Sequence, residues 1–138
     1  MRAQHDQHFL IDPNAVNRIA DITEVQGKKV LEIGPGNGAL TRALLDREAF
    51  VHAIELDTRL VEQLTDTFSR EIASGQLVLQ HGDATRCTFP PFEITVSNLP
   101  YSASSKITFR LLEQNFEVGV LMYQAEFADR MVAKAGTK

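Results

Sequence analysis

The stretch Val30-Leu-Glu-Ile-Gly-Pro-Gly-Asn-Gly-Ala-Leu-Thr41 joins three local signals. Its apolar start is typical of a buried β-strand, and the leucines and alanines that recur at helical spacing after it predict a helix. Between them, Gly34, Gly36 and Gly38 permit positive φ and let a ligand approach the backbone without a Cβ in the way. The backbone N–H groups of the first helical turn would face that ligand. The stretch therefore predicts a strand, a tight turn and a helix, with a nucleotide-like ligand over the turn.

The glycine spacing limits which nucleotide-binding class is favoured. It is Gly-x-Gly-x-Gly, whereas folds that bind a dinucleotide pyrophosphate use Gly-x-Gly-x-x-Gly. Pro35 also removes one N–H donor from the turn. On this stretch alone, a purely structural glycine turn and a ligand-binding turn both remain open.

Composition narrows the class of protein further. The 138 residues, 43% hydrophobic and 23% charged, are typical of one globular domain and exclude disordered and fibrous classes. The sequence contains neither an apolar run long enough to span a bilayer nor a secretion signal, so we expect a cytoplasmic protein. Cys87 is the single cysteine and has no Cys or His at ligand spacing, which argues against a zinc site. The net charge of −4 argues against non-specific coating of nucleic acid.

Two acidic residues follow predicted strands beyond the glycine turn. The strand expected at Val51–Glu55 ends on Glu55, 21 positions after Gly34 and after one intervening helix. This spacing is typical of a carboxylate that accepts hydrogen bonds from the two hydroxyls of a ribose. Asp83 follows the next expected strand, Gln76–Gln80. Because the carboxyl ends of parallel strands meet at one edge of a sheet, we expect both carboxylates beside the glycine turn, with Asp83 beyond the ribose, near an adenine amine.

The other elements continue the alternation of helices and strands, so the sequence predicts an α/β fold with a parallel, Rossmann-like sheet. An alternative role for Glu55 is to cap the next helix, but Asp57 suits that N-cap better. Helices are expected at 12–23, directly after residue 38, at 58–73 and at 126–135, and further strands at 93–97 and 118–123.

Four motifs occur in a characteristic order: residues 32–38, 54–57, 82–84 and Asn98-Leu99-Pro100-Tyr101. Together they resemble the class I S-adenosylmethionine-dependent adenine methyltransferases. Gln7-His8-Phe9-Leu10 near the start, and the stretch from residue 121 to 138, are similar to the ribosomal RNA adenine dimethyltransferase family in its archaeal and eukaryotic-like branch. The resemblance covers nearly the whole chain.

This resemblance implies a class I methyltransferase sheet that is incomplete at its C-terminal end. Residues 1–138 would form the N-terminal catalytic domain, with a helical C-terminal domain outside the chain. The implied reaction transfers methyl groups from S-adenosylmethionine to the exocyclic amines of two adjacent adenosines near the 3′ end of small-subunit ribosomal RNA. The implied partner is the immature small ribosomal subunit, and we expect a monomer that uses neither a metal nor a membrane.

Two other classes of function are weighed against this one. A nicotinamide-dependent oxidoreductase on a Rossmann sheet is disfavoured by the glycine spacing and by the Asn98–Tyr101 motif. A non-catalytic S-adenosylmethionine-binding factor for ribosome assembly or transcription is the second, and such a factor would not need the intact Asn98.

The resemblance also implies roles for individual residues. The Asn98 side-chain oxygen and the Leu99 carbonyl would accept the hydrogens of the target amine, Pro100 would fix the backbone, and Tyr101 would stack on the target base. The alternative for this motif is a strand-ending turn with a core tyrosine. Cofactor contacts carry over to His8, Leu10, Gly34, Gly36, Gly38, Glu55, Asp83 and Asn98.

Overall fold

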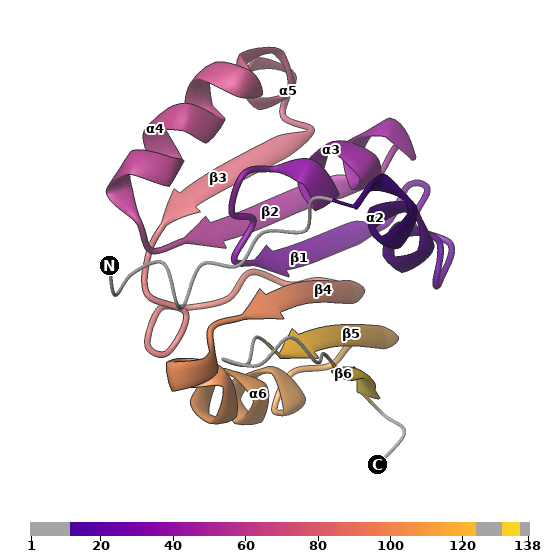
Figure 1. Cartoon of the computed structure of the whole chain (residues 1–138), viewed down its shortest axis with the longest axis vertical. Helices are drawn as coiled ribbons and strands as arrows, with labels where there is room; N and C mark the ends of the chain where they lie inside the picture. Colours follow the sequence, from indigo (N-terminus) through magenta and orange to yellow (C-terminus); the bar gives the residue numbers. More distant parts are fainter. Residues whose placement is uncertain (1–11, 124–130, 136–138) are drawn as a thin grey trace.

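The computed structural model describes residues 12–123 and 131–135. Within these residues, six strands form one sheet in the order β3-β2-β1-β4-β5-β6 (Figure 1). Every neighbouring pair from β3 to β5 is parallel, and β6 is antiparallel to β5. The bounds are β1 (Lys29–Ile33), β2 (Phe50–Glu55), β3 (Leu77–His81), β4 (Ile94–Leu99), β5 (Val118–Tyr123) and β6 (Met131–Ala135). The predicted parallel α/β fold is confirmed.

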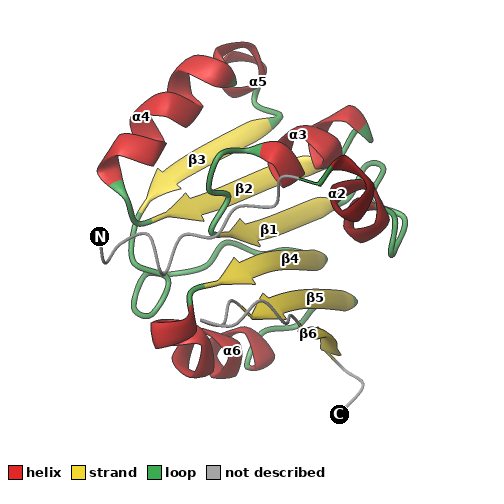
Figure 2. Cartoon of the chain, in the orientation of Figure 1, coloured by secondary structure: helices red, strands yellow, loops and turns green. Residues whose placement is uncertain are grey.

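Helices connect the strands and cover the sheet (Figure 2). They are α2 (Pro13–Ala20), α3 (Ala39–Asp46), α4 (Thr58–Thr67), α5 (Ser69–Ser74), the short 3-10 helix η1 (Tyr101–Ala103) and α6 (Ser104–Leu112). In Figure 2, α2 to α5 lie beside β1, β2 and β3, whereas α6 lies towards β5. Asp12 and Asp57 are the N-caps of α2 and α4 and accept hydrogen bonds from backbone N–H groups of the first turns, as the sequence predicts. In the described part of the chain, no helix combines the length and apolar character needed to cross a membrane.

Helices cover both faces of the sheet, which explains why most residues of the central strands β1, β4 and β5 are apolar and buried. Successive strand residues enter opposite apolar clusters: Val30 packs with α2, α3 and α4, and Leu31 packs with α6. The connection from β3 to β4 also covers the α6 face, through residues that include Phe89 and Phe92. Cys87 packs half-buried against the same cluster, as expected for a structural thiol.

Three predicted boundaries differ from the structure. The first helix ends at Ala20 and not near residue 23. The helix expected over 58–73 is interrupted at Phe68, whose ψ of 29° lets its fully buried ring point into the core between α4 and α5. The fourth strand continues to Leu99, because Asn98 and Leu99 still pair with β5. The Asn98–Tyr101 motif therefore begins inside the strand and not after it.

The end of the chain departs most from prediction. The helix expected over 126–135 is wrong for residues 131–135, which form β6, and residues 126–130 lie outside the described residues. An edge strand exposes a row of unpaired N–H and C=O groups. Antiparallel pairing with β6 provides hydrogen-bond partners for these groups of β5. Helix α6 and η1 had no counterpart in the sequence prediction.

Gly38 shows how the glycine turn is joined to the helices. It is the residue before α3 and has φ of 90°, a left-handed conformation that side chains rarely adopt. A Cβ on Gly38 would lie 2.8 Å from the Phe68 ring and 3.0 Å from Leu64. Gly38 is therefore required for packing α3 against α4.

We expect Gly38→Ala to lower the free energy of unfolding by about 1–3 kcal/mol more than Gly27→Ala does, because only the first change also overpacks the core. Gly27 is the matched control: its φ is 74°, but an added Cβ would meet nothing within 4 Å. Urea denaturation of both variants measures the difference. Equal losses would contradict the packing role of Gly38.

Candidate functional site

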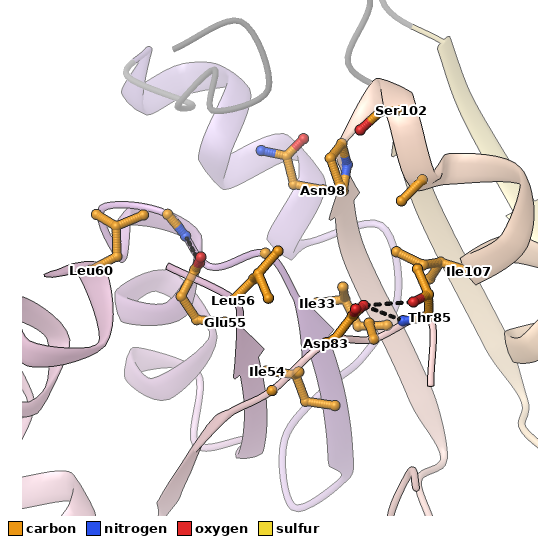
Figure 3. A pocket seen from close by; sticks show the side chains of 16 residues that line it. Ile33, Ile54, Glu55, Leu56, Leu60, Asp83, Thr85, Asn98, Ser102 and Ile107 are labelled. Carbon is orange, nitrogen blue, oxygen red and sulfur yellow. Dashed lines mark hydrogen bonds between the residues drawn. The ribbon is translucent and has the colours of Figure 1, made fainter. Parts of the chain in front are cut away.

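The candidate site lies where the strand order reverses. β1 has β2 on one side and β4 on the other, and in open parallel sheets ligands bind beyond the carboxyl ends of the strands at such a point. A pocket opens there (Figure 3). Its walls are largely apolar and include Ile33, Ile54, Leu60 and Ile107, and its polar side chains include Glu55, Asp83, Thr85, Asn98 and Ser102.

The glycine turn forms one wall of this pocket and lies in close contact with β4. Gly34 has φ of 77°, and a Cβ there would collide with the carbonyl oxygen of Asn98. Its N–H donates to the Ile54 carbonyl at 3.0 Å, which ties the turn to β2. Gly36 also lines the pocket, whereas Gly38 is not among the lining residues and packs against α4 instead.

Glu55 is held in place by backbone groups on both sides. Its Oε1 accepts the Gly36 N–H at 3.3 Å (Figure 3). Its Oε2 accepts the Asp57 N–H at 3.0 Å. The side chain is buried, and this burial raises its pKa, although the backbone N–H donors oppose the shift. Each carboxylate oxygen keeps a further lone pair for a ligand hydroxyl. The geometry thus fits an acceptor pair for a ribose.

Asp83 lines the same pocket from the loop after β3. Its Oδ1 accepts two hydrogen bonds from Thr85, from the N–H at 2.9 Å and from the hydroxyl at 2.7 Å (Figure 3). These bonds lower the pKa of Asp83, so its carboxylate is charged at neutral pH. A fixed carboxylate that does not take up a proton is a suitable acceptor for an amine hydrogen.

The Asn98–Tyr101 motif is divided between the pocket, the core and the surface. Asn98, near the end of β4, and Pro100 line the pocket. The Leu99 side chain is fully buried in the α6 cluster. Tyr101 is 62% exposed at the start of η1, so the alternative of a core tyrosine is wrong, and its ring is accessible.

Two expected cofactor residues, His8 and Leu10, lie outside the described residues. Among those that are described, no group of three or more His, Cys, Asp or Glu side chains is arranged to hold a metal ion.

The sequence analysis assigned no role to Glu32, whose burial beside the pocket becomes evident only in the folded sheet. It stands in the middle of apolar β1, is 1% exposed, and accepts a hydrogen bond of 2.6 Å from the Thr41 hydroxyl. Burial raises the pKa of Glu32 to about 8. The available signal was an acidic residue within a buried strand, two positions before the first glycine.

Arg110 on α6 supports the loop that carries Asp83. Its guanidinium donates to the Ala84 carbonyl at 2.6 Å and to the Cys87 carbonyl at 2.7 Å, and lies 4.5 Å from the centre of the Phe89 ring. The planar fork of arginine suits two carbonyl acceptors, which lysine cannot match. The sequence gives no local signal for this role, because Arg110 is 27 positions from Asp83.

The fold, the glycine turn and the acidic strand ends together define a class I methyltransferase domain. Two solved structures support this class at 34% sequence identity. A dimethyladenosine transferase from Plasmodium falciparum superposes with a TM-score of 0.74 over 88% of this chain and 45% of its own. The 23S rRNA methyltransferase ErmE superposes with a TM-score of 0.75 over 88% of this chain and 50% of its own.

The sequence comparisons define the family. The model of the ribosomal RNA adenine dimethylase family matches residues 1–138, and the chain belongs to that family. It is 59% identical, over its whole length, to a probable ribosomal RNA small subunit methyltransferase A of Methanospirillum hungatei, of which it covers 54%. A protein of the same name from Methanococcoides burtonii is 50% identical over 97% of this chain and 49% of its own. The chain therefore spans about half the length of the curated relatives that it matches.

We expect Arg110→Ala to lower the free energy of unfolding by about 1–3 kcal/mol, because two partly buried carbonyls lose a charged donor. Arg110→Lys should restore only part of this loss. Arg18→Ala, at an exposed position of α2, is the control and should change stability by less than about 0.5 kcal/mol. Chemical denaturation measures all three variants. A loss in Arg110→Ala no greater than in Arg18→Ala would contradict the supporting role.

Proposed function

We propose that this chain is the cofactor-binding and catalytic domain of an S-adenosylmethionine-dependent enzyme that dimethylates adenosines of small-subunit ribosomal RNA. The observation that carries the proposal is the convergence of Glu55, Asp83 and Asn98 on one pocket beside Gly34. Membership of the adenine dimethylase family supports adenine as the target base and dimethylation as the reaction. The chain is 59% identical to a small subunit methyltransferase and 34% identical to the 23S enzyme, which supports small-subunit RNA as the substrate.

The pocket fits an adenosine-containing cofactor on its own chemistry. A Cβ-free turn at Gly34 and Gly36 leaves room beside the backbone, Glu55 offers acceptors for ribose hydroxyls, and the charged Asp83 offers an acceptor for the adenine amine. Apolar walls suit the flat faces of a purine. When bound, S-adenosylmethionine supplies an electrophilic methyl group on a sulfonium.

The chain's own residues act on the target amine. The lone pair of an adenine exocyclic nitrogen is delocalised into the ring, which makes that nitrogen a poor nucleophile. The Asn98 side-chain oxygen and the Leu99 carbonyl accept its two hydrogens, which favours a pyramidal nitrogen and orients its lone pair. The exposed Tyr101 ring stacks on the base, which has to be flipped out or single-stranded to reach the pocket. These steps need positioning and hydrogen bonding only.

RNA affinity is assigned to the remainder of the full-length protein. The chain spans about half of its curated relatives and carries a net charge of −4, and each phosphate contact requires a cation. We propose that residues 1–138 form the N-terminal methyltransferase domain and that a helical C-terminal domain supplies most phosphate contacts. The full-length enzyme would act in the cytoplasm, as a monomer, on immature small ribosomal subunits.

We expect Glu55→Ala to weaken the binding of S-adenosylmethionine at least about tenfold, since a ribose hydroxyl would lose a charged acceptor. Glu62→Ala, on the exposed face of α4, is the matched control and should leave affinity unchanged. Calorimetric titration measures the affinity of each variant and of the wild type for S-adenosylmethionine, and a parallel titration measures the affinity of the wild type for NADH. Unchanged affinity in Glu55→Ala would remove Glu55 from the site, and tighter binding of NADH would favour an oxidoreductase instead.

We expect Asn98→Ala in the full-length enzyme to slow methyl transfer by about 100-fold or more, because an acceptor aimed at the reacting amine is lost. Asn115→Ala, at an exposed position before β5, is the control. Transfer of labelled methyl groups to immature small subunits measures the rate, and calorimetry measures cofactor affinity. Retained turnover would contradict the mechanism and support the non-catalytic alternative. A large loss of cofactor affinity would show that Asn98 also contacts the methionine part.

A further inference from the structure

The junction between β1 and β4 is less regular than the neighbouring junctions of the sheet. β1 pairs with β2 along its whole length, and β4 pairs with β5 from Ile94 to Leu99. Between β1 and β4, which both lie wholly within the described residues, the paired register ends at Leu31 and Thr95. Both strands nevertheless continue towards the pocket. The junction therefore divides the sheet into a half formed by β1, β2 and β3 and a half formed by β4, β5 and β6 (Figure 1).

Two hydroxyl groups of β4 bridge this junction. Thr95 Oγ1 donates to the Leu31 carbonyl at 2.9 Å, and Ser97 Oγ accepts the Ile33 N–H at 3.2 Å. The two hydroxyl oxygens are 3.0 Å apart. Since the hydrogen of the Thr95 hydroxyl is directed at Leu31, the Ser97 hydroxyl donates to Thr95 Oγ1. A chain of hydrogen bonds thus leaves β1 at one backbone group, passes through both side chains and returns to β1 at another.

Burial makes these bonds costly to lose. Thr95 and Ser97 are both 0% exposed, although the strand around them is apolar. Within the described part of the chain, every fully buried side-chain nitrogen or oxygen has a hydrogen-bond partner. Without the Ser97 hydroxyl, the Ile33 N–H would be left unpaired away from water. An apolar side chain of similar size would fill the same space, so the bonds across the junction explain the hydroxyls.

The bridge lies next to the pocket. The bond between Ser97 and Ile33 is one residue before the close contact of Gly34 with the Asn98 carbonyl, on both strands. The glycine turn and Glu55, which are assigned to the cofactor, follow β1 and end β2. Asn98, which is assigned to the target amine, belongs to β4 in the other half. The junction therefore sets the distance between the bound cofactor and the target base.

We propose that Ser97 is a positioning residue, which fixes the two halves of the sheet relative to one another so that Asn98 holds the target amine in line with the methyl group. This inference rests on the proposed function. Thr95 orients the Ser97 hydroxyl, and the Ile33 N–H fixes its oxygen. A displacement of about 1 Å between reacting groups can slow a reaction about 100-fold. Loss of the hydroxyl shifts Asn98 relative to a cofactor that stays bound to the other half.

The experiment is Ser97→Ala, which removes the hydroxyl and keeps the rest of the side chain. In the full-length enzyme we expect transfer of labelled methyl groups to immature small subunits to be at least about tenfold slower. Affinity for S-adenosylmethionine, measured by calorimetry, should change by less than about threefold, because the cofactor contacts of the β1 half are intact. A loss of rate without a loss of affinity distinguishes positioning from general destabilisation.

Hydrogen exchange tests the bond itself, independently of activity. In Ser97→Ala we expect the Ile33 amide hydrogen to exchange at least about tenfold faster than in the wild type, because it has lost its acceptor. The Gly34 amide donates to the Ile54 carbonyl within the β1 half and should keep its protection. Nuclear magnetic resonance of this chain measures both amides in the same sample.

Two matched variants complete the test. Ser97→Thr keeps a hydroxyl on the same atom and should restore most of the lost rate. Thr108→Val removes a hydrogen bond with the Tyr123 hydroxyl, away from the junction, and should change neither transfer nor the exchange of the Ile33 amide. Should Ser97→Ala not fold, Thr95→Val decides, because it removes the group that orients Ser97: slower transfer at unchanged cofactor affinity supports the proposal, and wild-type transfer overturns it.

The outcomes separate this inference from the function on which it rests. Wild-type transfer in Ser97→Ala, or equal losses of rate and cofactor affinity, would overturn the role of Ser97 and leave the proposed function intact. Slow transfer in Ser97→Thr with a protected Ile33 amide would overturn it too, since the bond would be present without its effect. Failure of the wild-type full-length enzyme to transfer methyl groups would overturn the proposed function itself.

Discussion

The close approach of Gly34 to the Asn98 carbonyl is the contact on which the rest of the site depends. No side chain fits between them, because a Cβ on Gly34 would overlap that oxygen. β1 and β4 are adjacent in the sheet although sixty residues lie between them in sequence. The turn that follows β1 and the motif that ends β4 therefore form one wall of the pocket, and their lining residues are fixed relative to one another.

The three acids around this wall differ in charge because their surroundings differ. Asp83 is partly exposed and takes two hydrogen bonds from Thr85, which keeps it ionised. Glu55 is buried but receives two backbone N–H groups. Glu32 is buried with a single hydroxyl donor and holds its proton at neutral pH. The pocket thus has hydrogen-bonded carboxylate acceptors on its lining and, behind it, an acid that burial keeps neutral.

The packing around the site explains how a domain of this length holds these groups in place. The two faces of the sheet are covered by different helices. Arg110 of α6 donates two hydrogen bonds to backbone carbonyls of the loop that carries Asp83. Gly38 packs against α4, and the Gly34 N–H bonds to β2, so the glycine turn is held by two neighbouring elements. Antiparallel β6 satisfies the edge of β5. The adenine dimethylase relatives are about twice as long as this chain. Gly34 and Asn98, which form the wall of the pocket, both lie within the part of those relatives that matches this chain.

Local patterns were sufficient for much of the fold. Short, mostly apolar runs predicted the parallel strands to within one or two residues, because a strand buried on both faces is mostly apolar. Glu55 and Asp83 could be expected in one place because strand ends converge at one edge of a parallel sheet, and Asn98 was singled out by its motif; the structure places all three on one pocket. Tertiary packing decided the rest. The interruption at Phe68 serves the core, β6 forms because β5 offers an unpaired edge, and Gly38 packs on α4 instead of lining the pocket. The protonation of Glu32 and the support from Arg110 depend on neighbours distant in sequence, which no local pattern contains.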